Sequence, residues 1–334
     1  MRRNFSLTML LMFLSLGSVL IGIYLGPVFL SPSKVNWAIF QGLKGLFIGT
    51  TKKTGIYIIV WEIRLPRVIV AYLTGTLLAS AGVAAQALFK NPLADPYLLG
   101  ISGGAAVGAS LAFAFFPSHV GSVAFLFSLI SVYVVYKVAK IRDRIPVENL
   151  LLAGIAYGFM AGAITSYLIV VLGPKAHLTW MWLMGSFNGA TWNNVPELLI
   201  ASVLGVLFLH LNWRNLNLLL LGDESIALGL DVDFFRKVVI VAIALMTSIT
   251  VPGVGIIGFV GLMAPHIVRF MVGPNHKRLV INTALFGGLL LVLADTLART
   301  IARPLDIPVG IITSMMGGPF FLYLLRRQKR GGLL

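Results

Sequence analysis

Three ionisable residues stand out because they lie within or beside long apolar stretches. His266 is a lone histidine at the end of the run GLMAPH, and Asp295 lies near the end of another apolar stretch with Arg299 four residues later. Charged side chains inside a membrane are usually paired or functional, and residues four apart lie on one face of a helix. We therefore expect an Asp295–Arg299 ion pair and a hydrogen-bonded structural role for His266. A proton relay needs several acids or histidines in a row, and Asp295 is almost alone.

Motifs for covalent catalysis and for nucleotide binding are missing. The chain has no G-x-x-x-x-G-K-[ST], no H-E-x-x-H and no G-x-S-x-G, which are the patterns of P-loops, zinc proteases and serine hydrolases. It also has no cysteine, which excludes disulfides and thiolate metal sites. We predict that the protein is not an enzyme and that the chain itself binds no ATP, metal or other cofactor.

The composition predicts an integral membrane protein. Of the 334 residues, 58% are hydrophobic and only 11% are charged, and the mean hydropathy is +0.94. Soluble domains carry about 25% charged residues, and a water-soluble core could not bury so many apolar side chains. The formal net charge of +15 could suggest a nucleic-acid partner. However, Lys and Arg form short clusters between apolar runs, which the positive-inside rule explains better, so we expect membrane lipid and no nucleic acid.

The elements that must position these residues are apolar runs long enough to cross the roughly 30 Å hydrocarbon core of a bilayer. Ten such runs predict an all-α polytopic membrane protein with a single transmembrane domain over 1–334. An even number places both termini on one side, which would carry 17 of the 26 Lys and Arg and is therefore predicted to be cytoplasmic. The seventh and eighth runs are separated only by Val251-Pro252-Gly253. The ten ranges are 5–29, 65–88, 97–116, 120–138, 148–172, 194–212, 235–252, 254–271, 280–298 and 308–325.

Three connecting segments are too long to be simple turns. Residues 31–62 and 173–193 are predicted outside the cell, the second with a short interfacial or re-entrant helix, and 213–234 is predicted in the cytoplasm. Small residues at helix-packing spacing are expected to let helices approach closely. These residues are Gly104, Gly108, Gly154, Gly158 and Gly162.

Several short motifs follow one another in order along nearly the whole chain. They are RLPR (64–67), NPLADP (91–96), LGISGGA (99–105), LLAG (151–154), WLMG (182–185), GDESIALG (222–229), GFVGL (258–262), PHIVR (265–269), PVG (308–310) and GGPF (317–320). Each motif alone would be weak evidence. As an ordered set they resemble the permease family of iron-siderophore, heme and vitamin B12 ABC importers.

The resemblance implies a ten-helix permease of the type II ABC importer fold, which forms a homodimer around a central translocation path. Two cytoplasmic ATPase subunits, which hold ATP and Mg²⁺, would bind on one side, and an extracytoplasmic substrate-binding protein would dock on the other. The expected function is uptake of an iron chelate (ferric siderophore or heme) or cobalamin across the cytoplasmic membrane of a bacterium or archaeon, by alternating access. An ion- or proton-coupled secondary transporter is the alternative.

The resemblance also assigns a coupling segment, which would contact the ATPase from within the loop 213–234. The segment starts with acidic residues, which suit a helix N-terminus, and continues with apolar ones. An ordinary amphipathic surface helix is the alternative. The coupling residues are Gly222, Asp223, Glu224, Ser225, Ile226, Ala227, Leu228 and Gly229.

Two further groups of residues receive roles in the same way. Arginines at the predicted outer helix ends would pair with acidic residues of the binding protein, with lipid-headgroup contact as the alternative. Two cytoplasmic loops would form a gate, although Val147 and Glu148 replace the small hydroxyl residues of the best-known vitamin B12 member, and Glu148 could instead cap the next helix. The docking residues are Arg64, Arg67 and Arg299; the gate residues are Asn91, Pro92, Leu93, Val147 and Glu148.

Overall fold

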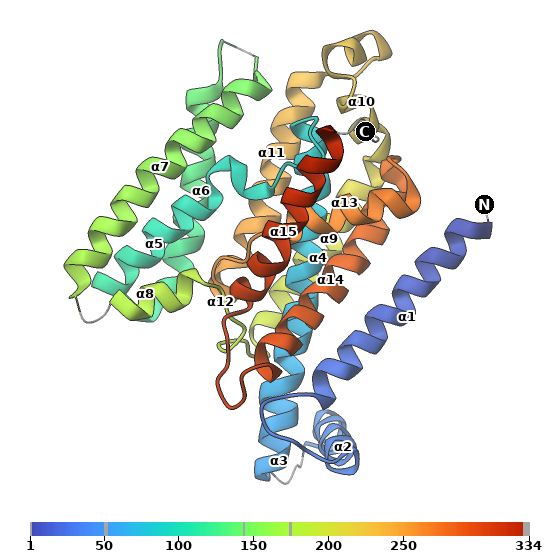
Figure 1. Ribbon diagram of the computed structural model, residues 1–334, viewed down its shortest axis with the longest axis vertical. Coiled ribbons are helices and arrows are strands. Elements are labelled where there is room, and N and C mark those ends of the chain that lie inside the picture. Colours follow the sequence, from blue (N-terminus) through green and yellow to red (C-terminus); the bar gives the residue numbers. More distant parts are fainter. Residues whose placement is uncertain (1, 50–52, 143, 174–175, 330–334) are drawn as a thin grey trace.

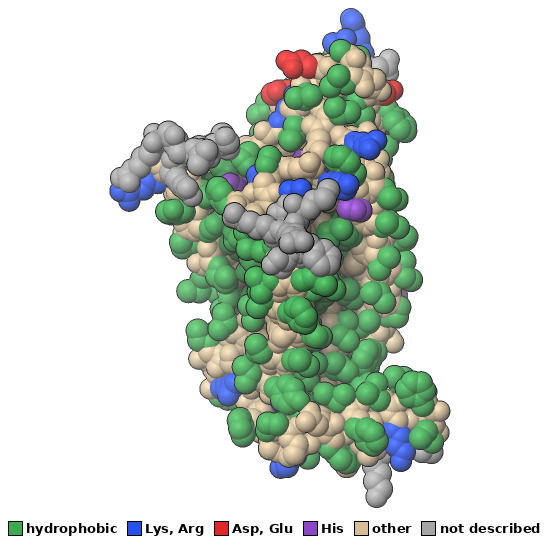
Figure 2. All heavy atoms as spheres, turned by 90° about the vertical axis from the view of Figure 1, so that its right-hand side faces the viewer, with side chains coloured by type: hydrophobic (Ala, Val, Ile, Leu, Met, Phe, Trp, Pro, Cys, Tyr) green, Lys and Arg blue, Asp and Glu red, His purple; other side chains and the backbone are tan. Residues whose placement is uncertain are grey.

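The computed structural model describes residues 2–49, 53–142, 144–173 and 176–329, and these residues form helices and no strand. Most of the long helices run roughly along one axis (Figure 1). In the part described, eight helical stretches are long and apolar enough to cross a membrane, and two shorter apolar helices fill the remaining predicted positions. On the face shown in Figure 2, hydrophobic side chains cover the middle, and Lys and Arg lie mainly toward the two ends. The all-α polytopic prediction is confirmed.

The long helices match the predicted spans closely, because hydrocarbon thickness fixes the length of an apolar run. They are α1 (Arg2–Tyr24), α4 (Leu65–Leu88), α6 (Val120–Ala139), α7 (Val147–Leu172), α9 (Asn194–Leu211), α11 (Val232–Ser248), α14 (His276–Thr300) and α15 (Val309–Lys329), with the shorter α5 (Ile101–Phe115) and α13 (Val260–Val272).

Short helices fill the connections. They are α2 (Pro32–Ile48), α3 (Gly55–Tyr57), η1 (Ile58–Arg64), η2 (Pro96–Leu99), η3 (Pro117–His119), α8 (Ala176–Leu183), α10 (Trp213–Leu219), η5 (Gly222–Leu228) and α12 (Val251–Val254). The helix expected within 173–193 is α8. In Figure 1, α10 and the end of α15 lie at what we call the upper end of the bundle, and α2 and α3 lie at the lower end.

The boundary between the seventh and eighth spans lies later in the chain than predicted. Helical structure resumes in α12 across Val251-Pro252-Gly253, where a proline in the first helical turn removes no hydrogen bond. The chain leaves helical geometry only afterwards, between Gly255 (φ +72°) and Phe259 (φ +68°). The second span of the pair therefore starts at Val260 instead of 254.

The central helix of the bundle is α4, which is buried along almost its whole length. It packs against α14, α13, α11 and α9. A Cβ atom at Gly75 would collide with the Gly287 carbonyl, and one at Gly82 would collide with the Gly261 carbonyl. In a membrane, helices associate through such close backbone approaches, so small residues fix where α14 and α13 meet α4.

The glycines predicted to pack divide into two groups. Added Cβ atoms at Gly104 and Gly108 would contact α6, and one at Gly154 would collide with the Leu98 carbonyl. Gly158 and Gly162, further along α7, have no neighbouring atom within 4 Å of that position among the described residues. The packing role is therefore confirmed for the first three, while α7 presents an open small-residue face.

Candidate functional site

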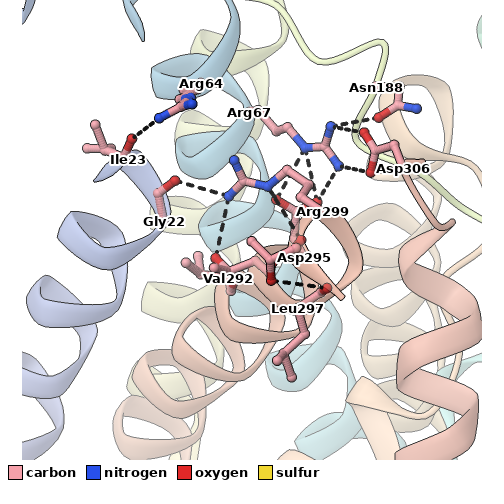
Figure 3. A network of polar contacts seen from close by, with 12 residues as sticks. Gly22, Ile23, Arg64, Arg67, Asn188, Val292, Asp295, Leu297, Arg299 and Asp306 are labelled. Atoms are coloured by element: carbon pink, nitrogen blue, oxygen red, sulfur yellow. Dashed lines mark hydrogen bonds and ion pairs between the residues drawn. The ribbon is translucent and has the colours of Figure 1, made fainter. Parts of the chain in front are cut away.

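A buried network of charges joins four segments at the lower end of the bundle (Figure 3). Its centre is Arg67, in the first turn of α4, whose Nη2 lies 2.7 Å from Asp295 Oδ1 on α14. Arg67 Nη1 lies 2.7 Å from Asp306 Oδ2, in the loop before α15, and donates to Asn188 Oδ1 at 2.6 Å. The planar guanidinium fork thus binds two carboxylates and an amide at once, which only arginine geometry permits.

The pair predicted from the sequence belongs to this network. Arg299 Nε lies 3.0 Å from Asp295 Oδ2, so one carboxylate is shared by two arginines, and both residues are only 1% exposed. Arg299 Nη2 also donates to the Gly22 carbonyl on α1 at 3.1 Å. The expected i,i+4 ion pair is confirmed, but it is one part of a larger network.

Arg64 is buried beside this network without a carboxylate partner among the described residues. Its Nη1 donates to the carbonyls of Ile23 and Tyr24 at 3.2 Å, and its Nη2 donates to the Val28 carbonyl. Ile23 and Tyr24 are the last residues of α1, where carbonyls lack helical partners and the helix dipole favours a cation. Arg64 therefore caps α1.

The three predicted docking arginines are thus brought together, but inside the protein. None is more than 6% exposed, and their guanidinium groups are held by partners within the chain. The alternative, lipid-headgroup contact, would require these side chains to leave their buried positions. Docking to a binding protein stays a prediction, and for Arg67 and Arg299 it requires the bonds to Asp295 to open.

Two members of the network were not identified from the sequence. Asn188 and Asp306 lie in loops, where no helical periodicity relates them to Arg67. One signal in the sequence pointed to Asp306: acidic residues are few, only 11 in the chain, so each one near a buried arginine is a candidate counter-ion. Asp306 follows Arg299 by seven residues and lies just beyond the end of the same helix. Arg64, Arg67, Arg299, Asn188 and Asp306 also line a cavity of about 330 Å³.

The predicted coupling segment lies at the upper end. It is the 3₁₀ helix η5, with three residues per turn, instead of an amphipathic α-helix. Left-handed glycines bound it at Gly222 (φ +67°) and Gly229 (φ +84°), so the segment is a separate short element, as 3₁₀ helices usually are. Ser225 is buried, whereas the remaining side chains, Asp223, Glu224, Ile226, Ala227 and Leu228, are exposed.

A buried arginine of α11 holds this segment. Arg236 Nη2 lies 3.2 Å from Asp223 Oδ1 in η5, and its Nη1 donates to the Ile145 carbonyl at 3.4 Å. The Asp233 carboxylate accepts a bond from the Ile145 N–H at 3.1 Å and lies 3.6 Å from Arg236. Ile145 lies two residues before Val147. The second predicted gate loop, Val147–Glu148, is therefore not a loop, because both residues lie in the first turn of α7. The coupling segment and the chain leading into α7 are attached to the same turn of α11.

The first gate loop also contacts the coupling segment. Lys90 precedes Asn91-Pro92-Leu93, and its Nζ occupies the space that a Cβ at Gly222 would need. Within the loop, Asn91 Oδ1 accepts a bond from the Leu93 N–H at 2.9 Å. The residues that precede the two predicted gate segments, Lys90 and Ile145, thus touch η5 or its anchor on α11.

Of the remaining sequence candidates, His266 has a hydrogen-bonding partner and Val147 and Glu148 lie at a helix start. His266 is buried, with Nδ1 3.3 Å from the Pro92 carbonyl. Glu148 is exposed in the first turn of α7, where an acidic residue suits the helix dipole, and Val147 is half-buried beside it.

Among the described residues, no three His, Asp or Glu side chains are grouped as metal ligands would be.

Asp95 gives the first gate loop a titratable group near neutral pH. Its carboxylate accepts a bond from the Tyr97 N–H at 2.9 Å, and burial raises the pKa of the carboxyl to about 6 although that bond opposes the rise. The native state therefore binds this proton more tightly than the unfolded chain, whose Asp pKa is about 3.9. The contribution of this carboxyl to the free energy of unfolding is at its full value below about pH 4 and is lost as the pH rises to about 6.

We expect Asp95→Asn to remove this part of the pH dependence. Thermal unfolding midpoints of the detergent-solubilised protein at pH 4.5 and pH 7 provide the measurement. The unmodified protein should lose more stability over that interval than the variant, because only its carboxyl must ionise where the protein partly shields it from water. Equal losses in the two proteins would contradict the assignment.

Comparison with known proteins places the chain among membrane permeases. The sequence profile described as the FecCD transport family matches residues 10–327. A cobalamin import system permease protein of Halobacterium salinarum is 43% identical over 81% of this chain and 74% of its own length. A hemin transport system permease protein of Yersinia pestis is 39% identical over 81% and 84%, and an iron chelatin transport system permease protein of Helicobacter pylori is 37% identical over 86% and 88%.

A solved structure has the same fold. It is described as an inward-facing conformation of a metal-chelate type ABC transporter, and it matches with a TM-score of 0.82. The match covers 97% of this chain and 99% of that chain, with 28% sequence identity. The likeness therefore extends over the whole bundle, including both ends described above.

Proposed function

The chain belongs to the FecCD transport family, and on this premise we propose that it is the membrane-spanning subunit of an ABC importer. The cargo is a metal chelate, such as a ferric siderophore or heme, or cobalamin. The relatives bear names for cobalamin, hemin and iron chelatin transport, which supports this class of bulky, metal-containing cargo.

The observation that carries the proposal is the position of η5. It exposes an acidic and apolar surface at one end of the bundle, and it is connected to the chain just before each predicted gate segment, by contact with Lys90 and through Arg236, which also binds the Ile145 carbonyl. A partner ATPase that pushed on η5 would therefore move the residues that lead into both gate segments. In the proposed mechanism, ATP binding and hydrolysis on the partner chains move η5, and the gate loops open and close the path by alternating access.

The upper end is proposed to face the cytoplasm. It holds η5, and the described termini lie toward it (Figure 1). The excess of Lys and Arg predicted for this side supports the orientation. The lower end then faces the extracytoplasmic binding protein, and the Arg67–Asp295–Arg299 network lies beneath the docking surface.

We further propose a homodimer. Gly158 and Gly162 on α7 and Gly318 on α15 leave open space where a Cβ would lie, whereas Gly75 and Gly82 of α4 are filled by neighbouring helices. Exposed small residues permit close approach of a second transmembrane helix. A second copy of the chain, related by a twofold axis, would cover these faces and enclose a path between the two subunits.

The competing function is an ion- or proton-coupled secondary transporter. Such a carrier would use ionisable groups inside the membrane. Asp295 is the buried carboxylate best placed for that role, but two arginines bind its two oxygens at 2.7 and 3.0 Å. Both oxygens of this carboxylate are engaged by guanidinium groups, so the geometry favours a structural role over proton transfer.

Uptake by proteoliposomes tests the proposal. The chain is reconstituted with its ATPase and binding protein and is offered ferric siderophore, heme and cobalamin in parallel. We expect ATP-dependent accumulation of one cargo that requires both partners. Accumulation driven by a proton gradient without the ATPase would overturn the importer assignment.

A further inference from the structure

Two apolar grooves lie on either side of one helix, α11, and run along the bundle between its ends. The α9–α11 groove has a volume of about 590 Å³ and is lined by residues such as Ile200, Leu204 and Val238. The α6–α11 groove has a volume of about 360 Å³ and is lined by residues such as Leu129 and Ala244. Neither groove belongs to the η5 site or to the buried charge network.

The grooves are separated by a ridge that both of them share. Val241 and Leu245 line both grooves, and they are 55% and 50% exposed. The small residue beside the ridge, Gly205, is already covered, because a Cβ there would lie 2.8 Å from Met246 Cε. The exposed ridge itself is thus made of branched side chains. Helix–helix contacts in membranes prefer small residues, so this face suits flexible hydrocarbon better than another helix.

The charges at the two ends of the grooves differ in sign. Lys237 lines the α6–α11 groove near the upper end, together with Tyr133 and Tyr136. Glu197 lines the α9–α11 groove near the lower end, at the start of α9. An occupant with an anionic end would therefore place that end at Lys237 and away from Glu197.

The Lys237 ammonium is available for such an occupant. In the described residues it has no carboxylate within 4 Å, and the acid one turn before it, Asp233, is engaged by Arg236 and the Ile145 N–H. A second cation, Lys137, lies on α6 with its Nζ 5.5 Å from the centre of the Tyr133 ring. Lys237 and two tyrosines thus line the upper part of the α6–α11 groove, with Lys137 beside one of the tyrosines, and tyrosine is favoured where a membrane meets water.

We propose that α11 carries a specific site for an anionic phospholipid with two acyl chains. One chain lies in each groove, so the lipid straddles the Val241–Leu245 ridge, and its phosphate contacts Lys237 with Lys137 nearby. The headgroup lies at the end proposed to be cytoplasmic, and anionic lipids on that side attract basic residues. The proposal does not depend on which cargo is transported.

Lipid titration of the purified full-length protein tests the headgroup contact. Native mass spectrometry would count bound phosphatidylglycerol, with phosphatidylcholine as the zwitterionic comparison. We expect phosphatidylglycerol to bind more tightly than phosphatidylcholine. Lys237→Gln should lower the affinity for phosphatidylglycerol about fivefold, because one lysine near an anionic lipid contributes about 1 kcal/mol. Lys277→Gln, an exposed lysine at the same end on α14, is the matched control and should change nothing. Equal binding of the two lipids, or equal effects of the two variants, would overturn the site.

Two further measurements test the acyl chains and the identity of the occupant. Single-chain lysophosphatidylglycerol should bind more weakly than the two-chain lipid, and Ala242→Phe, which fills the α9–α11 groove, should reduce this preference. No difference between the lipids would overturn the two-groove arrangement. Because the chain has no cysteine, Val241→Cys introduces a unique thiol on the ridge. Disulfide formation between copies in the membrane would assign the face to a second copy instead, whereas its absence agrees with lipid.

Discussion

Asp295→Asn is expected to lower the free energy of unfolding by about 3–5 kcal/mol, the range found when one partner of a buried ion pair is removed. Asp295 is 1% exposed and binds Arg67 at 2.7 Å and Arg299 at 3.0 Å. The neutral amide would leave two guanidinium groups close together with one remaining carboxylate, Asp306, which reaches only Arg67. Desolvated positive charges would then repel each other in a place where water cannot screen them.

Denaturation of the detergent-solubilised protein would measure this loss. Asp306→Asn is the matched control, because its side chain is 23% exposed and Arg67 keeps Asp295 in that variant. We expect it to cost about 1 kcal/mol, as for other partly exposed pairs. Adding Arg299→Met to Asp295→Asn should restore part of the stability, since it removes one of the uncompensated charges. If Asp295→Asn cost no more than Asp306→Asn, the network would not hold the lower end together.

The sequence could predict only the local part of this network. Asp295 and Arg299 are four residues apart on one helix, so their contact follows from helical geometry. Arg67 lies on α4, 228 positions from Asp295, and their meeting depends on α4 packing against α14. Lipid makes every outward helix face apolar, so the hydrophobic pattern does not reveal which helices are neighbours. Close contacts between glycines, such as Gly75 of α4 and Gly287 of α14, determine which helices pack together. A single sequence does not show that these two glycines meet.

For the helices too, the sequence predicts some features and leaves others to the folded structure. Span positions were predictable because bilayer thickness sets the length of an apolar run. The point where helical structure ends, at Gly255, could not be predicted in the same way. It depends on the φ of +72° of this one residue, which lies within a continuous apolar stretch. The motif predicted a short segment over 222–229, and the structure has the 3₁₀ helix η5 there, bounded by left-handed glycines and bonded to Arg236 of α11, which the sequence did not reveal.

Ile226→Arg is expected to reduce ATP-dependent uptake at least tenfold while leaving the fold unchanged. Ile226 is 61% exposed in η5, so an arginine there meets water in the isolated chain and disturbs no packing. In the proposed complex, the same side chain would be buried against the ATPase, where truncation or charge at a central apolar contact typically costs 2 kcal/mol or more. A loss of about 1.4 kcal/mol already corresponds to tenfold weaker binding.

Ile48→Arg on α2 separates this effect from a general cost of surface arginine. Ile48 is 62% exposed, close to the value for Ile226, but it lies at the lower end, far from η5 along the bundle (Figure 1). Both variants should have the same unfolding midpoint, and only Ile226→Arg should lose retention of the ATPase during purification. If retention and uptake survived Ile226→Arg, the ATPase would have to act elsewhere on the upper end. Lys90 and Arg236, which connect η5 to the residues before the two gate segments, would then have no part in coupling, because the force they are proposed to transmit enters through η5.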